Sequence, residues 1–254
     1  MGNEMSEVSG NCWSEGQILM HRKAGQLLEE TILETRKFIA KNNSTESEAN
    51  EFVLRKYAER RLATDDNTAI IAFNENSAIP HYYPKENSKR LEEKALVLID
   101  VWAKLGKPEA PYADITRVFV NGKEAKKEFR ETFEVVAKAR DECIEFIKSK
   151  LVAGEMPLGI EADNAARKVI AEAGFEKNIL HGTGHCLGTE GPHGLFGNIN
   201  QKNGPALEKN LGYTIEPGVY FENRFGIRSE MDFFIDGKMR FVHTAKLQRE
   251  LDEL

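Results

Sequence analysis

The stretch from residue 211 to residue 235 constrains the fold more than any other part of the sequence. It reads LGYTIEPGVYFENRFGIRSEMDFFI, and its alternation of apolar and polar residues predicts two strands joined by a loop. Glu216 and Glu230 each stand among neighbours that are apolar enough for a core. A Pro-Gly pair after Glu216 breaks the ladder, since proline has no N–H to donate. Buried carboxylates need a counter-charge, and a metal ion is one common source of it.

Length and composition favour a globular protein from a reducing compartment. The 254 residues are enough for one large core or two modest ones. The formal net charge is −6 with Lys and Arg interspersed, so there is no basic stripe for nucleic acid, and no segment has the apolar length of a membrane span. The cysteines lie far apart in the sequence, as is typical of reduced thiols. We expect a cytoplasmic protein that binds neither nucleic acid nor membranes.

The order of predicted elements divides the chain into two similar halves. Helical spacing of apolar residues predicts helices over 15–41, 45–61, 123–150 and 162–173. Apolar or alternating runs predict strands over 69–73, 95–101 and 114–120, and a strand fragment with a short polar helix over 241–254. We therefore expect a flexible lead-in over 1–14 and a single domain over 15–254, built from two αββ halves placed back to back.

Each predicted strand pair carries two carboxylates, Asp100 and Asp114 in the first half and Glu216 and Glu230 in the second. With one imidazole they form a hard, oxygen-rich ligand set. Four carboxylates at a common seam cannot all ionise without compensation, because each like charge raises the pKa of its neighbours. Two divalent cations would supply that compensation and would activate a water molecule for hydrolysis. The alternative is that these are exposed side chains on ordinary strands and that the symmetry is accidental.

These motifs resemble those of the pita-bread metallopeptidases, a family that includes methionine aminopeptidase, aminopeptidase P, prolidase and creatinase. The matching segments follow one another in the same order, as LID at Asp100, ADITR at Asp114, HGTGHCLG at His185, TIEPGVY at Glu216 and FGIRSE at Glu230. The resemblance implies an α+β pita-bread fold, in which two pseudo-symmetric αββ halves form a curved antiparallel sheet with the helices outside. It also implies that the chain corresponds to the catalytic domain alone.

The resemblance implies a dinuclear metal centre as well. Asp100 would bind one metal ion, Asp114 and Glu230 would bridge the two, and His185 and Glu216 would bind the other. We expect Mn²⁺ as the cofactor, with Co²⁺, Zn²⁺ and Fe²⁺ as alternatives.

Further residues match functional positions of the family. His81, within PHYYP, matches a histidine of proline-specific members that positions the substrate and shuttles a proton. His181 matches a histidine near the substrate pocket, and His193 resembles one that hydrogen-bonds the scissile carbonyl or its oxyanion. Arg228 matches a guanidinium beside the bridging carboxylate. The alternative for each histidine is that it only braces its own loop.

The sequence thus predicts a dinuclear metal-dependent aminopeptidase or dipeptidase that acts on the N-terminal bond of peptides, with Xaa-Pro as the expected bond. The predicted catalytic residues are His81, His193, Glu216 and Arg228. The predicted substrate-binding residues are His81, His181 and His193. Glu216 would act as the general base. The alternatives are a methionine aminopeptidase and a non-catalytic module that binds peptides or proteins. We expect a monomer or a homodimer.

Overall fold

The computed structural model describes residues 12–65 and 69–254. Its first half comprises α1 (Glu15–Asn42), α2 (Glu46–Arg60), β1 (Leu62–Ala63), β2 (Ile70–Phe73), the 3-10 helix η1 (Asn74–Ala78), β3 (Leu96–Leu105) and β4 (Ala113–Val120). The second half comprises α3 (Lys127–Val152), α4 (Gly159–Glu172), the 3-10 helix η2 (Glu176–Asn178), β5 (Gly212–Ile215), β6 (Gly218–Phe221), β7 (Phe225–Arg228), β8 (Met231–Ile235), β9 (Phe241–His243) and β10 (Asp252–Glu253). Most of the lead-in predicted over 1–14 lies outside the described residues.

The four long helices form where the apolar spacing predicted them. Capping boxes open α1 and α2: the hydroxyl of Ser14 accepts from Gln17 N–H, and that of Thr45 accepts from Glu48 N–H. Each cap satisfies N–H groups that the first turn of a helix leaves without partners. The capping pattern at Thr45, read from the sequence, is thereby confirmed.

The first-half sheet is centred on β3. It pairs antiparallel with β4 along its length and with β1 and β2 on its other edge. The register places Asp100 opposite Thr116 and Trp102 opposite Asp114. Since residues two apart on a strand, and residues directly opposite each other, share a face, these four side chains lie on one side of the sheet.

The second-half strands are interrupted twice, whereas the sequence predicted a break only at Pro217, just after Glu216. Each is interrupted, so that β5 pairs with β8 and β6 pairs with β7, and Glu216 and Glu230 lie in the interruptions. Pro217 causes the first, because it cannot donate to the ladder. At these breaks Glu216 N–H donates to Thr183 O (2.7 Å) and Glu230 N–H points to Thr116 O (3.5 Å). The predicted break at Pro217 is therefore confirmed, whereas the expectation of one continuous strand through Glu230 was wrong. Both breaks connect the glutamates to other segments.

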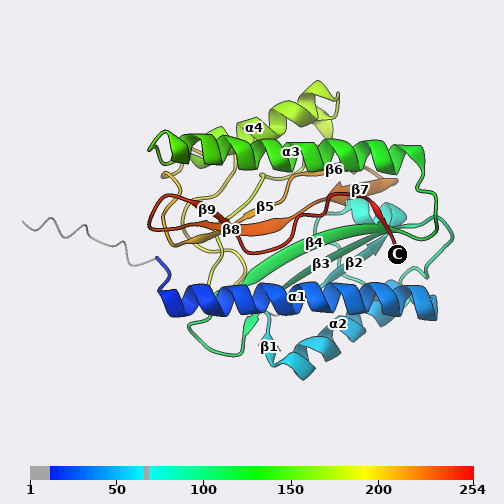
Figure 1. Ribbon diagram of the computed structural model, residues 1–254. Coiled ribbons are helices and arrows are strands. Elements are labelled where there is room, and N and C mark those ends of the chain that lie inside the picture. Colours follow the sequence, from blue (N-terminus) through cyan, green and yellow to red (C-terminus); the bar gives the residue numbers. More distant parts are fainter. Residues whose placement is uncertain (1–11, 66–68) are drawn as a thin grey trace, which may run out of the picture.

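Helices flank the strands on two sides (Figure 1). The helix α1 packs on β3 and β4 with α2 beside it, and α3 packs against β5, β6, β7 and β9 with α4 beside it. The two halves meet where β4 contacts β7 and β8 and where η1 contacts β7. The buried apolar side chains of both halves form one continuous core. The architecture is α+β with almost entirely antiparallel pairing, as predicted.

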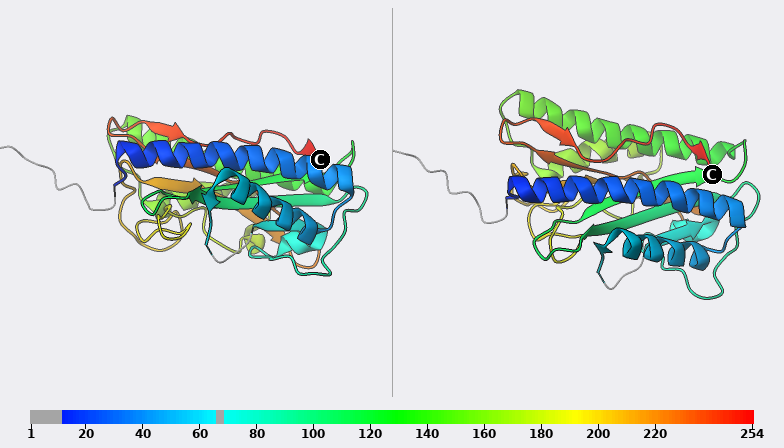
Figure 2. Two further views of the ribbon diagram at one scale, coloured as in Figure 1. Left: turned by 90° about the horizontal axis from the view of Figure 1, so that it is seen from below. Right: turned by 60° about the horizontal axis from the view of Figure 1, so that its bottom comes forward.

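The C-terminal segment is extended, which contradicts the short polar helix predicted within 241–254. It runs between α1 and α3 (Figures 1 and 2), and β10 pairs parallel with β4. The side-chain amide of Gln248 accepts from Val118 N–H (3.1 Å) and donates to Val118 O (2.6 Å). Arg140 Nη1 donates to Gln248 O (2.8 Å). The bonds to Val118 satisfy backbone groups at the free edge of β4, and together with the bond from Arg140 they hold the segment extended.

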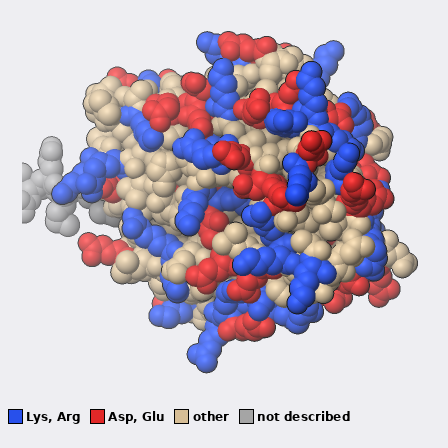
Figure 3. Space-filling model, turned by 45° about the vertical axis from the view of Figure 1, so that its right-hand side comes forward, with Lys and Arg blue, Asp and Glu red and all other residues tan. Residues whose placement is uncertain are grey.

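The surface carries charges of both signs. On the face in Figure 3, Lys and Arg are interspersed with Asp and Glu, without a large area of one sign. Within residues 12–65 and 69–254, no helix is long and apolar enough to cross a membrane.

Candidate metal centre

One cavity of about 550 Å³ brings together every residue that the sequence predicted for the site. These residues are His81, Asp100, Asp114, His181, His185, His193, Glu216, Arg228 and Glu230. They come from the loop after η1, from β3 and β4, from the glycine-rich loop before β5, and from the broken strands of the second half.

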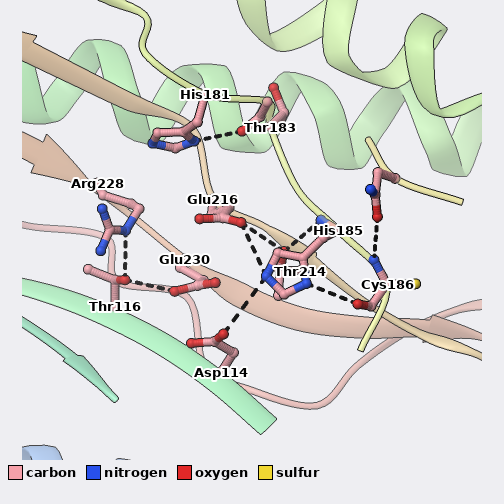
Figure 4. Close-up of polar contacts among 12 residues, drawn as sticks. Asp114, Thr116, His181, Thr183, His185, Cys186, Thr214, Glu216, Arg228 and Glu230 are labelled. Carbon is pink, nitrogen blue, oxygen red and sulfur yellow. Dashed lines mark hydrogen bonds and ion pairs between the residues drawn. The ribbon is translucent and has the colours of Figure 1, made fainter. Parts of the chain in front are cut away.

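His185 presents a lone pair to this cavity. Its Nδ1 lies 3.0 Å from Cys186 O, and since a carbonyl only accepts, Nδ1 carries the proton. Burial lowers the pKa of His185 to about 4, so the ring is neutral at pH 7 and Nε2 is unprotonated. That nitrogen faces Glu216 Oε1 at 3.4 Å and Asp114 Oδ2 at 3.8 Å (Figure 4). Three acceptors therefore face one another.

The carboxylates near Nε2 of His185 repel one another. Asp114, His185 and Glu230 each offer one ligand atom, and these atoms lie within 4.8 Å of one another. Burial, and then the charge of Glu230, raises the pKa of Asp114 well above its usual range. Burial, and then the charges of Glu216 and Asp100, does the same for the pKa of Glu230. Protons or cations must offset this repulsion, and an imidazole lone pair among carboxylate oxygens is a donor set that fits a divalent metal ion.

Asp100 lines the cavity and also forms an ion pair with Arg228. The buried guanidinium forms an ion pair with Asp100 Oδ2, donates from Nη1 to Tyr220 Oη (2.8 Å) and donates from Nε to Thr116 Oγ1 (3.1 Å). Asp100 Oδ1 is buried and has no hydrogen-bond partner among the described residues. A buried, unpartnered oxygen is costly, so this atom is suited to a metal ion.

Two residues of this network were not identified from the sequence. Thr116 Oγ1 accepts from Arg228 and donates to Glu230 Oε2 (2.7 Å), so one hydroxyl connects the two halves (Figure 4). Its position two residues after Asp114 on the same strand is a signal that could have identified it. Tyr220 connects Arg228 to His181, and no local pattern indicates this role.

The other predicted histidines differ in how their rings are held. His193 stacks on His185, with ring centroids 3.8 Å apart and planes 12° apart, and burial followed by the neighbouring His185 lowers its pKa to about 4. His181 uses both ring nitrogens within the protein, Nδ1 with Gly182 O (2.7 Å) and Nε2 with Tyr220 Oη (2.7 Å). His81 is exposed at the cavity. The catalytic and substrate-binding roles of these rings stay predictions.

The glycine-rich loop lies close against β5, which explains its glycines. A Cβ at Gly184 would clash with the Thr214 carbonyl. The close approach lets Thr214 N–H donate to His185 O (2.9 Å) and His185 N–H donate to Thr214 Oγ1 (3.0 Å). From α4, the buried Asp163 accepts from the N–H and the hydroxyl of Thr183 at 2.9 and 2.7 Å. The backbone of His185 is thus fixed on both sides.

A buried histidine supports the site from behind. His21, for which the sequence indicates only a surface or structural role, is fully buried, and its Nδ1 donates to Tyr112 O (2.8 Å). Its Nε2 therefore accepts from the hydroxyl of Thr244 (2.8 Å). The neighbouring Asp232 accepts from Asp114 N–H (2.9 Å), so it fixes the backbone of a predicted ligand. The structural role of His21 is confirmed.

Comparisons with known proteins agree with this geometry. The model of metallopeptidase family M24 matches residues 20–236. The Xaa-Pro dipeptidase of Pyrococcus horikoshii is 30% identical over 241 residues, which are 94% of this chain and 63% of the relative. The Xaa-Pro dipeptidase of Pyrococcus furiosus is 31% identical over 198 residues, which are 77% of this chain and 52% of the relative.

Solved structures give the same result. The X-Pro aminopeptidase of Thermotoga maritima has a TM-score of 0.82 and 28% identity, over 96% of this chain and 64% of that one. The prolidase of Pyrococcus furiosus has a TM-score of 0.78 and 27% identity, over 94% of this chain and 66% of that one. This chain therefore spans about half to two thirds of the length of these relatives. The predicted pita-bread fold is confirmed, and the chain belongs to metallopeptidase family M24.

Proposed function

We propose that this protein is a dinuclear metal-dependent peptidase that hydrolyses the bond between an N-terminal residue and a following proline. The observation that carries the proposal is the set of acceptors in the cavity, where the unprotonated Nε2 of His185 faces Asp114 and Glu216. The names of the similar proteins, Xaa-Pro dipeptidase and X-Pro aminopeptidase, support proline as the residue after the cleaved bond.

The metal ligands in this proposal are Asp100, Asp114, His185, Glu216 and Glu230. Asp114 and Glu230, which are buried and each offer a ligand atom close to that of His185, would help to hold both ions, with Mn²⁺ as the expected metal. When bound, such a pair of ions supplies a Lewis acid for the scissile carbonyl and lowers the pKa of a water molecule.

Glu216 is the proposed general base. Its side chain is 17% exposed, against 9% for Asp114 and 8% for Asp100, so it is better placed to reach the substrate. Its Oε1 accepts from the hydroxyl of Thr214 (3.3 Å), which fixes the carboxylate toward the cavity. From this position Glu216 takes a proton from the attacking water, and this proton then becomes available for transfer to the leaving amine.

In this proposal His193 acts at the carbonyl oxygen of the cleaved bond and His81 acts at its nitrogen. The stacking of His193 on His185 holds its ring in the cavity, where a neutral imidazole donates to the developing oxyanion. A bond before proline is a tertiary amide, so its nitrogen has no N–H. Like the nitrogen of any amide, it must be protonated as it leaves. His81 would handle that proton, and the cavity-lining Tyr83 and Trp102 would pack against the pyrrolidine ring.

The test compares kcat/KM for Ala-Pro, Ala-Pro-Ala and Met-Ala-Ser with Mn²⁺-saturated protein. We expect both prolyl peptides to be cleaved at least about tenfold faster than the methionyl peptide. Glu216→Gln, which loses the proposed base and a proposed metal ligand, should cleave none of them. Faster cleavage of Met-Ala-Ser would replace the proposal with a methionine aminopeptidase. Binding of these peptides without cleavage would indicate a non-catalytic module.

A further inference from the structure

Glu46, the first residue of α2, is a buried carboxylate outside the cavity. Its residue is 0% exposed, and the described residues include no cation paired with it. Burial raises the pKa of Glu46, and its hydrogen bonds oppose that shift. A carboxylate is expensive to bury, so this position needs a reason beyond packing.

The donors to Glu46 all come from one segment, residues 73–89. Oε1 accepts from Phe73 N–H (2.6 Å) and Asn76 Nδ2 (2.9 Å). Oε2 accepts from the hydroxyl of Tyr82 (2.7 Å) and from Lys89 N–H (3.1 Å). One carboxylate thus fixes the beginning, the middle and the end of the segment.

This segment carries the cavity wall that contains His81. Pro80, His81 and Tyr83 line the cavity, whereas Tyr82 donates in the opposite direction, to Glu46. Asn76 Nδ2 also lies 3.0 Å from Tyr82 Oη and reinforces its position. Because the phenol is held on the core side, the residues on either side of it face the cavity.

We propose that Glu46 is a positioning residue, which through Tyr82 holds the loop so that the imidazole of His81 faces the metal centre. It contacts neither the substrate nor the predicted metal ligands, and it acts on the reaction through His81. The inference rests on the proposed function, in which His81 handles the proton of the leaving proline nitrogen.

The variant Tyr82→Phe tests this most cleanly, because it removes one bond to Glu46 and leaves the bonds from Phe73, Asn76 and Lys89. We expect kcat for Ala-Pro to fall about tenfold with KM within about twofold, since an imperfectly placed acid–base group slows the chemical step. The matched control is Tyr213→Phe, which removes the hydrogen bond between the hydroxyl and Glu208 N–H (2.8 Å) and does not line the cavity. We expect it to lower the melting temperature without changing kcat.

A double-mutant cycle separates positioning from simple stabilisation. His81→Ala alone is expected to lower kcat about 10²-fold, the usual scale for a lost acid–base group. If Tyr82 acts through His81, adding Tyr82→Phe to His81→Ala changes kcat no further. Multiplying effects of the two substitutions would overturn the inference while leaving the role of His81 intact. An unchanged kcat in His81→Ala would overturn both the inference and that part of the proposed function.

Hydrogen exchange gives a readout that needs no activity. In Tyr82→Phe the amides of residues 79–84 should exchange several-fold faster than in wild type, whereas Tyr213→Phe leaves them unchanged. Glu46→Gln places an amide NH₂ where donors already point, so it should accelerate exchange over the whole of 73–89. Equal protection of residues 79–84 in wild type and Tyr82→Phe would overturn the inference, even if Glu46→Gln fails to fold.

Discussion

The aspartates of the first half stand within continuous strands, whereas the glutamates of the second half stand where strands break. Asp100 and Asp114 lie inside β3 and β4, and their directions follow from strand alternation. Glu216 and Glu230 lie between β5 and β6 and between β7 and β8. A continuous ladder uses all its backbone bonds within the sheet, whereas a break frees N–H groups for other partners.

The N–H groups freed at the two breaks contact other parts of the site. Glu216 N–H bonds to Thr183, two residues before His185, and Glu230 N–H points to Thr116, two residues after Asp114. Each break therefore connects a second-half glutamate to a segment that carries another predicted ligand. The first half therefore holds its aspartates within a paired sheet, and the second half holds its glutamates by backbone contacts outside its own strand pairs.

The helices of the two halves resemble each other more closely than the strands do. Near the start of α2 and of α4 there is a buried carboxylate, Glu46 and Asp163, and each holds a loop that brings histidines to the cavity. They differ in their partners, because Asp163 also pairs with Arg167 (2.7 Å) whereas the donors to Glu46 are neutral.

The largest effect is expected where the second half closes the site. Glu230→Ala removes a proposed bridging carboxylate from a buried position, so we expect purified protein to lose the bound pair of metal ions and its activity. Elemental analysis after Mn²⁺ loading and desalting measures this. Glu222→Ala, at an exposed turn between β6 and β7, is the matched control and should retain full metal content. Full metal content in Glu230→Ala would contradict the assignment of Glu230.

A smaller effect is expected from disturbing the close approach in the glycine-rich loop. Gly184→Ala places a methyl group against the Thr214 carbonyl, and overpacking of this kind costs roughly 1–3 kcal/mol of unfolding free energy. Urea unfolding of the metal-free protein measures it. Gly191→Ala, in the same loop with open space around its Cβ, should be close to neutral. Equal stability of the two variants would mean that the loop is not fixed as described.

The last expected effect concerns repulsion in the metal-free protein. The pKa of Asp114 is raised in the folded state, so the folded protein keeps a proton that the unfolded chain releases above its ordinary pKa of 3.8, and stability is lost as the pH rises toward the folded pKa. Asp114→Asn does not titrate. We expect its stability relative to wild type to grow with pH, by up to about 1.4 kcal/mol per pH unit within that window. Unfolding curves from pH 5 to 8 measure this, and a pH-independent difference would contradict it.

Local sequence patterns were sufficient to predict the four long helices. Amphipathic spacing and the capping box at Thr45 located the long helices. The resemblance to the pita-bread metallopeptidases, rather than any local pattern, supplied the full set of nine residues that line one cavity. The break beside Glu230 has no comparable signal, since it arises when an N–H turns to Thr116 on another strand. The C-terminal segment was predicted incorrectly because Gln248 is held by a distant strand edge, which local periodicity does not report.

The sequence patterns also did not identify the buried carboxylates on the helices. Glu46 and Asp163 belong to amphipathic helices, where charged side chains ordinarily face solvent. Their burial depends on donors from segments 20 or more residues away, such as Thr183 for Asp163. Sequence spacing alone does not contain that information.

The most direct test of the central claim follows hydrolysis of Ala-Pro as metal-free protein is titrated with Mn²⁺. If carboxylates from both halves form one dinuclear centre, the rate should be negligible without metal, rise with added Mn²⁺ and reach a plateau at two equivalents per chain. Undiminished hydrolysis by the metal-free protein, or no hydrolysis at any amount of Mn²⁺, would contradict it.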